Sequence, residues 1–244
     1  MSGCTLCFMA DRILIVVAAE REARAVLTAL GAGDGAAGGS KVGLPGEWEL
    51  ASLGRIDVLR SGVGKSNAAG ATGRFLDPAK HRLVLNVGIG GALPDSGLSI
   101  LDAVIADECV FADEGVRTPD RFLSLSDVGF PCMAGRRDSV ASAAGAAREL
   151  GLGLGDAMRV GAIATVSVCS GTDELAAEIR ARTGAIAEGM EGAACGLVAA
   201  RVGVRFAELR VISNRTGRRD QQGWNLAGAF ERLGEVLGPL RAMR

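Results

Sequence analysis

The sequence has no tyrosine and a single histidine, His81. Any catalytic triad that depends on an imidazole could use only this residue. His81 lies in the segment Asp-Pro-Ala-Lys-His-Arg, just before a predicted strand and on the side of the sheet away from the strand tips. We therefore predict that His81 has a structural position at the surface and that catalysis does not use histidine.

Neither sign of charge is in excess, because 27 basic and 28 acidic residues give a net charge of −1. Nucleic-acid binding depends on neutralising phosphates, so this balance argues against nucleic acid as a partner. No apolar run reaches the roughly 18 residues of a membrane span, and Arg12, Glu20 and Arg21 interrupt the run near the N-terminus. The N-terminus also lacks the pattern of a secretory signal. We expect a cytoplasmic protein that does not bind membranes.

Six cysteines are scattered along the chain. Cys4 and Cys7 form a CxxC pair, but a zinc site would need a second pair or histidines beside it. Cys109, Cys169 and Cys195 lie in apolar surroundings and are expected to be small buried hydrophobic residues. The sequence therefore predicts no metal site and no redox role for these thiols.

Apolar runs alternate with helical patterns along the 244 residues. Strands are expected at 13–19, 48–53, 56–60, 83–87, 101–111, 160–168, 185–187 and 206–212. Helices are expected at 20–30, 65–76, 138–150, 172–182, 192–201 and 226–243, and long loops at 31–46 and 113–137. This alternation predicts one α/β domain over 1–244, with a mostly parallel sheet and helices on both faces. The hairpin at 48–60 makes the sheet mixed, and residues 1–11 are expected to form a flexible tail.

The apolar strand predicted at 206–212 is followed at once by polar residues. Eight positions then hold seven of them: Ser213, Asn214, Arg215, Thr216, Arg218, Arg219 and Asp220. In open α/β sheets, ligands bind just beyond the carboxyl ends of the strands. A neutral amide at a strand end, with a carboxylate six residues later, suits recognition of a polar heterocycle. The alternative is a solvated turn held by salt bridges.

Two glycine-rich segments come close to phosphate-binding motifs but lack a required residue. Gly64-Lys-Ser would need a glycine five residues earlier to form a P-loop, and that position is Leu59. Gly88–Gly91 would need a third spaced glycine to form a dinucleotide fingerprint, and that position is Leu93. Both segments follow apolar strands, where glycine permits close approach of the backbone to a ligand. Ordinary tight turns are the alternative.

Glutamates follow two of the predicted strands. Glu20 and Glu22 begin the first helix, where the helix dipole favours negative charge. That role is purely structural; in the functional alternative, Glu22 points into a site and holds a water molecule. Glu188 and Glu191 flank Gly189-Met190 after the short strand at 185–187. Glu191 opens an apolar helix, so it either caps that helix or accepts hydrogen bonds from the hydroxyls of a ligand.

Together these segments resemble the nucleoside phosphorylase/nucleosidase superfamily. The resemblance rests on five segments in the right order: Ala-Ala-Glu-Arg-Glu22, Ser61-Gly-Val-Gly-Lys65, Asn86-Val-Gly-Ile-Gly-Gly91, Met190-Glu191-Gly-Ala-Ala and Ile212-Ser-Asn214. Within the superfamily the chain is most similar to the futalosine hydrolases, through the segment Ile212–Trp224. The resemblance implies a three-layer α/β sandwich around a mixed sheet, and a homo-oligomer.

The resemblance also implies roles for individual residues. Glu22 would orient or deprotonate the attacking water, and Glu191 with Met190 would hold the ribose hydroxyls. The base and the sugar would be lined by Gly88, Ile89, Gly90 and Gly91. The partner would be a small-molecule nucleoside, and no metal or organic cofactor is implied.

The base would lie near Val168, Cys169 and Asn214. Related nucleosidases place an aromatic ring near the first two; this chain has none there, so Trp224 would supply the stacking surface. Methylthioadenosine/S-adenosylhomocysteine nucleosidases carry aspartate at the position of Asn214, which suits a 6-amino base. An amide can donate to N7 or O6 of a 6-oxopurine and accept from its N1–H. Asn214 therefore favours a base such as hypoxanthine.

The expected reaction is hydrolysis of the N-glycosidic bond of futalosine, which releases hypoxanthine and dehypoxanthine futalosine in menaquinone biosynthesis. Asp220 would assist departure of the base as a general acid, a contribution of about 10²–10⁴ in rate, or would instead pair with Arg215 or Arg219. The benzoate of the substrate side arm would meet a basic residue. The candidates are Arg117, Arg137, Arg215 and Arg218.

Three other functions stay open. A purine nucleoside phosphorylase would use phosphate in place of water; Arg60 and Lys65 could bind the anion, although Glu22 would repel it. A methylthioadenosine/S-adenosylhomocysteine nucleosidase would release adenine. A non-enzymatic nucleoside-binding protein on the same fold would release no base at all.

Overall fold

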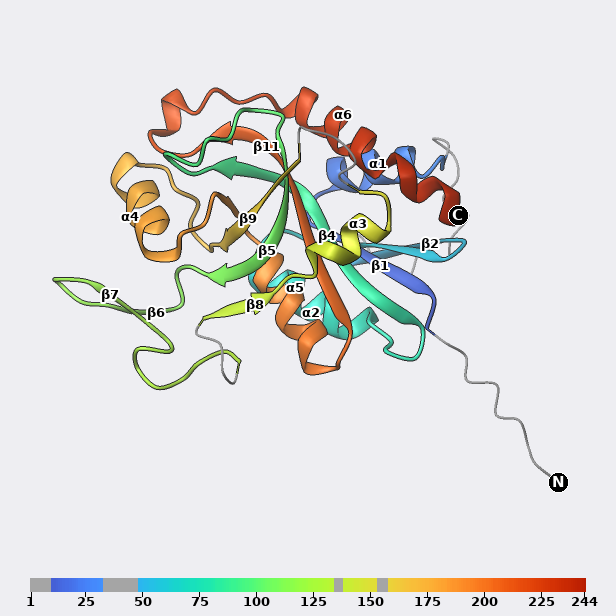
Figure 1. Ribbon diagram of the computed structural model, residues 1–244, viewed down its shortest axis with the longest axis horizontal. Helices are drawn as coiled ribbons and strands as arrows, with labels where there is room; N and C mark the ends of the chain where they lie inside the picture. The colour runs from blue at the N-terminus through green and yellow to red at the C-terminus, as the bar shows by residue number, and fades with distance from the viewer. Residues whose placement is uncertain (1–9, 33–47, 134–137, 153–157) are drawn as a thin grey trace.

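The computed structural model describes residues 10–32, 48–133, 138–152 and 158–244 (Figure 1). The CxxC pair, nearly all of the expected tail 1–11 and most of the loop expected at 31–46 lie outside the described residues. Within the described ranges, no helix combines the length and the apolar character needed to cross a membrane.

Strands and helices alternate along the chain. The strands are β1 (Arg12–Val17), β2 (Glu49–Leu53), β3 (Ile56–Arg60), β4 (His81–Ala92), β5 (Ala103–Phe111), β6 (Gly115–Arg117), β7 (Phe122–Ser124), β8 (Ser139–Ala141), β9 (Met158–Thr165), β10 (Ala187–Gly189) and β11 (Arg205–Arg215). The helices are α1 (Glu20–Ala29), α2 (Lys65–Phe75), α3 (Ala144–Glu149), α4 (Asp173–Thr183), α5 (Gly192–Arg201) and α6 (Leu226–Leu237), with short 3-10 helices η1 (Arg219–Gln221) and η2 (Gly238–Met243).

One large sheet carries these helices. Its strand order is β10-β9-β5-β11-β4-β1-β3-β2, and β8 pairs with β5. Among the described strands of this sheet, five pairings are parallel and four are antiparallel. Strand β10 pairs with both β9 and β4, so β4, β11, β5, β9 and β10 form a closed ring. The predicted mixed sheet, with an antiparallel β2–β3 hairpin, is confirmed.

Helices cover both faces of the sheet (Figure 1). Successive side chains of a strand point to opposite faces. Ile13, Ile15 and Val17 of β1 therefore share one apolar core with residues of α1, α3 and α6. Leu14 and Val16 belong to a second core with residues of α2 and α5. These two cores confirm the predicted α/β sandwich.

Two expected elements differ from the structure. Residues 138–150, expected as one helix, form β8 and then α3. Ser139–Ala141 pair with Glu108–Val110 of β5, because the backbone groups at that buried edge need partners. The loop expected at 113–137 contains the hairpin β6–β7, which projects from the body of the protein (Figure 1). Local patterns did not show either pairing.

The glycine segment 88–91 lies inside β4, whereas the sequence predicts that it follows the strand. Gly88 is opposite Arg210 of β11, and Gly91 is opposite Glu188 of β10. Pairing on both sides extends β4 to Ala92. Strand β11 likewise continues to Arg215, with an irregularity between Ile212 and Asn214.

His81 is structural, as predicted, but it is buried and begins β4, so its predicted place at the surface is wrong. Its Nε2 lies 2.9 Å from Oδ2 of Asp57, and its Nδ1 accepts a hydrogen bond from the backbone N–H of Asp77 at 3.0 Å. Burial favours the neutral form of Asp57, but hydrogen bonds from His81, Arg12 and Ser52 outweigh burial and lower its pKa. These polar contacts make burial of the imidazole tolerable.

Candidate active site

A cavity of about 220 Å³ opens where β1, β4, β10 and β11 end. Nine of the twelve residues predicted for the site line it: Glu22, Ile89, Gly90, Gly91, Cys169, Met190, Glu191, Asn214 and Trp224. The remaining three, Gly88, Val168 and Asp220, are not part of its lining. The cavity therefore lies at the edge of the sheet that the polar strand ends predict.

Glu22 caps its helix and also faces the cavity. In the first turn of α1, its Oε2 accepts hydrogen bonds from the backbone N–H groups of Ala18 at 3.1 Å and Ala19 at 2.9 Å. Its Oε1 accepts from the backbone N–H of Ile89 on β4 at 3.0 Å. Burial raises the pKa of Glu22, although Arg210 and the backbone donors oppose this effect. The carboxylate is thus fixed in the cavity wall and suited to accept a proton.

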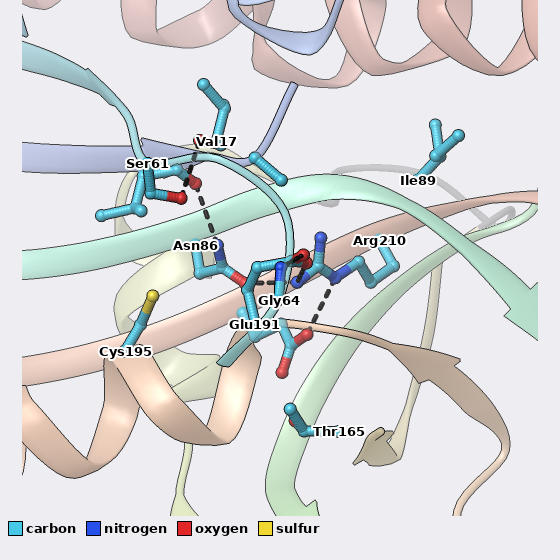
Figure 2. A network of polar contacts seen from close by, with 12 residues as sticks. Val17, Ser61, Gly64, Asn86, Ile89, Thr165, Glu191, Cys195 and Arg210 are labelled. Carbon is cyan, nitrogen blue, oxygen red and sulfur yellow. Dashed lines mark hydrogen bonds and ion pairs between the residues drawn. The ribbon is translucent and has the colours of Figure 1, made fainter. Parts of the chain in front are cut away.

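Glu191 is fixed at the start of α5. Its Oε1 accepts from the backbone N–H of Gly64 at 3.0 Å, and its Oε2 lies 3.3 Å from Nη2 of Arg210 (Figure 2). Gly64 has a φ of +93°, a backbone conformation that glycine adopts readily and other residues rarely do. In a P-loop the backbone N–H groups bind phosphate, whereas here the N–H of Gly64 donates to the carboxylate of Glu191.

Arg210 lies between the carboxylates and was missed by the sequence reasoning. It is fully buried; its Nε donates to Oε1 of Glu208 at 2.8 Å, and its Nη2 donates to Oδ1 of Asn86 (Figure 2). Burial lowers the pKa of Arg210, but Glu208, Glu191 and Glu22 outweigh burial and raise it. The guanidinium therefore carries its charge inside the protein and connects the carboxylates around it.

Glycines of β4 allow these side chains to come close together. A Cβ at Gly88 would lie 2.4 Å from Oε1 of Glu22 and 2.5 Å from Nη1 of Arg210. A Cβ at Gly91 would lie 2.8 Å from Cγ2 of Thr216. Gly88 thus contributes space for Glu22 and Arg210, although it is not part of the cavity lining.

Asn214 faces the cavity from the end of β11. Its Nδ2 donates to the backbone carbonyl of Arg215 at 2.8 Å and lies 3.4 Å from Oε1 of Gln222. Its Oδ1 accepts from the hydroxyl of Ser213 at 2.8 Å. Gln222 also lines the cavity, and its Nε2 donates to the backbone carbonyls of Ser170 and Gly217. Two neutral amides therefore lie side by side in this wall.

Glu188 is a further carboxylate of the cavity wall, and it was not among the predicted site residues. It is buried on β10, where its Oε1 accepts from the backbone N–H of Ser170 at 2.9 Å and its Oε2 accepts from the Ser170 hydroxyl at 2.5 Å. Burial raises the pKa of Glu188, and both bonds from Ser170 oppose that effect. No three His, Cys, Asp or Glu side chains of the described residues are placed to share a metal ion.

Trp224 and Arg219 form the outer rim of the cavity. Trp224 is 43% exposed, and the guanidinium of Arg219 lies over its ring, 4.6 Å from the centroid. Cys169 also lines the cavity and is exposed, so its prediction as a buried hydrophobic residue is wrong. It follows β9 in a loop, whereas Cys109 and Cys195 are buried as predicted.

Known proteins share this sequence pattern. The family model described as Phosphorylase superfamily matches residues 12–237. This chain belongs to the phosphorylase superfamily. The futalosine hydrolase of Acidothermus cellulolyticus is 38% identical over 237 residues, which cover 96% of this chain and 92% of that protein. The futalosine hydrolase of Streptomyces coelicolor is 36% identical over 196 residues, covering 75% and 77%. The resemblance seen in the sequence is confirmed.

Solved structures of nucleosidases share the fold. The 5′-methylthioadenosine/S-adenosylhomocysteine nucleosidase from S. pneumoniae has a TM-score of 0.73 at 20% identity and covers 96% of this chain and 100% of that chain. The corresponding enzyme from Helicobacter pylori has a TM-score of 0.72 at 21% identity, covering 96% and 97%. At this identity the likeness establishes the nucleoside phosphorylase-like fold of the predicted sandwich.

Two residues predicted for the site of this superfamily member are exposed and do not line the cavity. Val168 is 66% exposed. Asp220 lies on η1 with its side chain 69% exposed, and Oδ2 of its carboxylate is 3.5 Å from Nη2 of Arg218. Arg218 thus pairs with Asp220, whereas the sequence suggested Arg215 or Arg219 as partners.

Three of the four basic candidates for the substrate side arm also lie outside the cavity lining. Arg117 pairs with Glu178 at 2.8 Å, and neither Arg215 nor Arg218 lines the cavity. Arg137 lies outside the described residues. Arg219, which the sequence reasoning did not offer for this role, is the arginine that lines the cavity in the described part of the chain.

Proposed function

We propose that this superfamily member hydrolyses the N-glycosidic bond of futalosine, releasing hypoxanthine and dehypoxanthine futalosine as a step in menaquinone biosynthesis. The relatives named futalosine hydrolase, 38% and 36% identical, support the substrate. One structural observation carries the reaction. A buried, fixed carboxylate, Glu22, shares a cavity with a neutral amide, Asn214.

The nucleophile in this proposal is water. Glu22 takes a proton from water as the water oxygen bonds to C1′ of the ribose. The bond from C1′ to the base nitrogen breaks and its electron pair passes to the base. The base takes a proton from solvent, and Glu22 returns to solvent the proton that it accepted, so that one water is consumed in all. The transition state is oxocarbenium-like, as in glycoside hydrolysis. Negative charge on Glu22 and Glu191 stabilises the positive charge on the ribose.

We assign Glu22, Glu191 and Arg210 to the sugar side of the cavity. Both carboxylates face the cavity, and Arg210 connects them from behind. Glu191 accepts hydrogen bonds from the ribose hydroxyls, and Met190 packs against the sugar. Because all three charged groups are held before substrate binds, they need little reorganisation during the reaction.

We assign Glu188, Asn214 and Gln222 to the base side. The N–H of Asn214 that points to Gln222, at 3.4 Å, donates instead to N7 or O6 of hypoxanthine, and a carboxylate oxygen of Glu188 accepts from its N1–H. The two side chains converge over Gly91, where a Cβ would lie 3.4 Å from Nδ2 of Asn214 and 3.6 Å from Cγ of Glu188. Trp224 and Cys169 supply the surface against the ring. Adenine has a lone pair at N1, so it suits this arrangement less well.

The residues considered for phosphate binding support water over phosphate. Arg60 pairs with Glu49 at 2.7 Å, and Lys65 pairs with Asp113 at 2.5 Å. Neither residue lines the cavity. Their charges are taken up by carboxylates of the protein, so they do not form the anion site that a phosphorylase needs.

The proposal includes a cytoplasmic homo-oligomer. Exposed apolar side chains support it: Val116, Phe130 and Val168 are 48%, 73% and 66% exposed. Such residues on a surface are suited to contacts between copies. Light scattering on the purified protein would give a mass above 24.9 kDa; a mass of one chain would contradict the oligomer.

Release of free base from three nucleosides tests the proposed function. Futalosine, inosine and methylthioadenosine would each be incubated with and without phosphate, and the products separated by chromatography. We expect hypoxanthine from futalosine at a rate independent of phosphate. Phosphate-dependent cleavage of inosine would indicate a phosphorylase, and adenine from methylthioadenosine would contradict the base preference. Stoichiometric binding without base release would indicate a binding protein.

A further inference from the structure

Glu208 is a buried carboxylate that the proposed reaction does not use. It lies on β11 with 0% exposure, two residues before Arg210, and it is not part of the cavity lining. Side chains two residues apart on a strand point to the same face. A carboxylate in such a place loses its hydration, which is unfavourable unless charges and hydrogen bonds compensate. The groups that contact this carboxylate therefore indicate its role.

Residues of three elements, β11, β5 and α5, surround this carboxylate. Oε1 of Glu208 accepts from Nε of Arg210 at 2.8 Å, and Oε2 accepts from the thiol of Cys109 on β5 at 2.8 Å. On the third side lies Gly192, the first residue of α5. A Cβ there would lie 1.8 Å from Oε2 of Glu208, so no larger residue fits without displacing the carboxylate.

The contact with Glu208 sets the orientation of the guanidinium of Arg210. With Nε held, the planar group can direct its two remaining nitrogens in only one way. Nη2 reaches Asn86 and Glu191 (Figure 2), and Nη1 faces Glu22 across Gly88. Glu208 thereby acts on both carboxylates of the sugar side without touching the cavity.

Glu208 also balances the charge of Arg210. The charged groups that act on Glu22 are Arg210 from β11 and Glu191 from the start of α5. Arg210 lowers the pKa of Glu22, while Glu208 is a main cause of the raised pKa of Arg210 itself. Without the negative charge of Glu208, the positive charge of Arg210 acts on Glu22 with less compensation. In the proposed reaction, kcat/KM declines at low pH as Glu22 becomes protonated. This decline, the acid limb of the pH profile, then moves to lower pH.

We propose that Glu208 is a positioning residue, which holds Arg210 so that Glu22 and Glu191 are correctly placed and charged for hydrolysis. This role rests on the proposed function. Gly192 leaves the space that the carboxylate occupies, and the contact with Arg210 carries the role, because the thiol of Cys109 is only a weak donor. The buried pair of Glu208 and Arg210 therefore affects the rate of hydrolysis through Glu22 and Glu191, in addition to its contribution to the packing of the core.

Two substitutions of Glu208 distinguish the effect of its hydrogen bond to Arg210 from the effect of its negative charge. Glu208→Leu removes both, and we expect kcat to fall by roughly 10²-fold, the size of effect that a displacement of about 1 Å can have, with a smaller change in KM. Glu208→Gln keeps an oxygen for Nε of Arg210, so we expect kcat to fall less than about tenfold. Its acid limb of kcat/KM should still move to lower pH.

Cys109→Ala is the matched control. It removes the other partner of Glu208 from the same buried place but leaves the contact with Arg210. We expect its kcat and acid limb to stay close to those of the wild type. Gly192→Ala, which displaces the carboxylate, should reproduce the loss seen in Glu208→Leu.

The substrate in these assays is whichever of the three nucleosides the wild type cleaves, so a failure of the futalosine proposal remains a separate result. Far-UV circular dichroism and cooperative melting show whether each variant folds. A folded Glu208→Leu variant with wild-type kcat and acid limb would overturn the role of Glu208. Equal losses in Cys109→Ala would also overturn it, because they would indicate packing alone. If Glu208→Leu does not fold, the acid limb of Glu208→Gln decides.

Discussion

The sugar side and the base side of the cavity are built from different chemistry. On the sugar side, Glu22 and Glu191 are held by backbone N–H groups and by the buried charge of Arg210. On the base side, the neutral amides of Asn214 and Gln222 donate to the backbone carbonyls of Arg215 and Gly217, and the carboxylate of Glu188 is held by Ser170 and by no arginine among the described residues. The sugar side thus concentrates fixed charge where positive charge develops, whereas the base side offers directional hydrogen bonds. The proposed function therefore assigns the rate of hydrolysis to the first wall and the choice of base to the second.

The largest expected effect comes from removing the charge of Glu22. In Glu22→Gln, kcat for futalosine should fall by roughly 10²–10⁴-fold, because water loses its general base. The matched control is Glu20→Gln, because Glu20 lies in the same first turn of α1 but its side chain is 74% exposed and pairs with Arg24. Steady-state kinetics of both variants tests this prediction. Turnover near the wild-type rate in a folded Glu22→Gln protein would remove Glu22 from the mechanism.

A change of amide to acid at Asn214 should alter the choice of base. In Asn214→Asp, the ratio of kcat/KM for a 6-oxopurine nucleoside to that for its 6-amino counterpart should fall roughly 5- to 150-fold, since a buried hydrogen bond is lost or left unpaired. Asn225→Asp is the control, because Asn225 only caps α6 and aspartate caps equally well. An unchanged ratio would show that Asn214 does not read the base.

The pH dependence should report the burial of Glu22. Its pKa is raised, and in the proposed reaction the ionised form accepts the proton from water. Activity is therefore expected above this pKa and is lost as pH falls through it. We expect kcat/KM for futalosine to decline about tenfold per unit at a pH above the ordinary glutamate value of about 4.3. Glu188→Gln should keep this limb, which separates the two buried carboxylates. A profile that stays flat down to that ordinary value would contradict the assignment.

The smallest expected effect is at the rim of the cavity. Arg219→Ala should raise KM for futalosine about 2- to 5-fold, because a partly exposed cation contributes modestly to binding the benzoate of the side arm. Inosine, which lacks that side arm, should show no change in KM. Arg218→Ala is the control, since Arg218 is exposed and outside the cavity lining. Equal effects of the two variants would place the side arm elsewhere.

The sequence identified most of the site because its residues follow strand ends. Glu22, Glu191 and Asn214 each follow or end an apolar run, where polar residues are unusual unless they bind something. Arg210 and Glu208 were missed because they lie inside the run 206–212, which the sequence predicts as a buried strand. The signal was present: an acidic and a basic residue two positions apart in such a strand share a face and must find partners.

Other differences depend on contacts that no local pattern encodes. Asp220 and Gln222 are two residues apart, and only the course of the loop brings Gln222 to the cavity and leaves Asp220 exposed. The segment 138–150 has a helical pattern, but part of it forms β8. This strand pairs with Glu108–Val110 of β5, beyond the residues of β5 that pair with β11. The sequence places Gly88–Gly91 after a strand, and their pairing with β10 and β11 is what puts them inside β4.

The most direct test of the division between the two walls is one ratio measured in three proteins. Wild type, Glu22→Gln and Asn214→Asp would each be assayed with a 6-oxopurine nucleoside and its 6-amino counterpart, and the two values of kcat/KM compared. Our account predicts that Glu22→Gln lowers both values by the same factor and leaves their ratio unchanged, while Asn214→Asp changes the ratio. A shift of the ratio in Glu22→Gln as large as that in Asn214→Asp would contradict it.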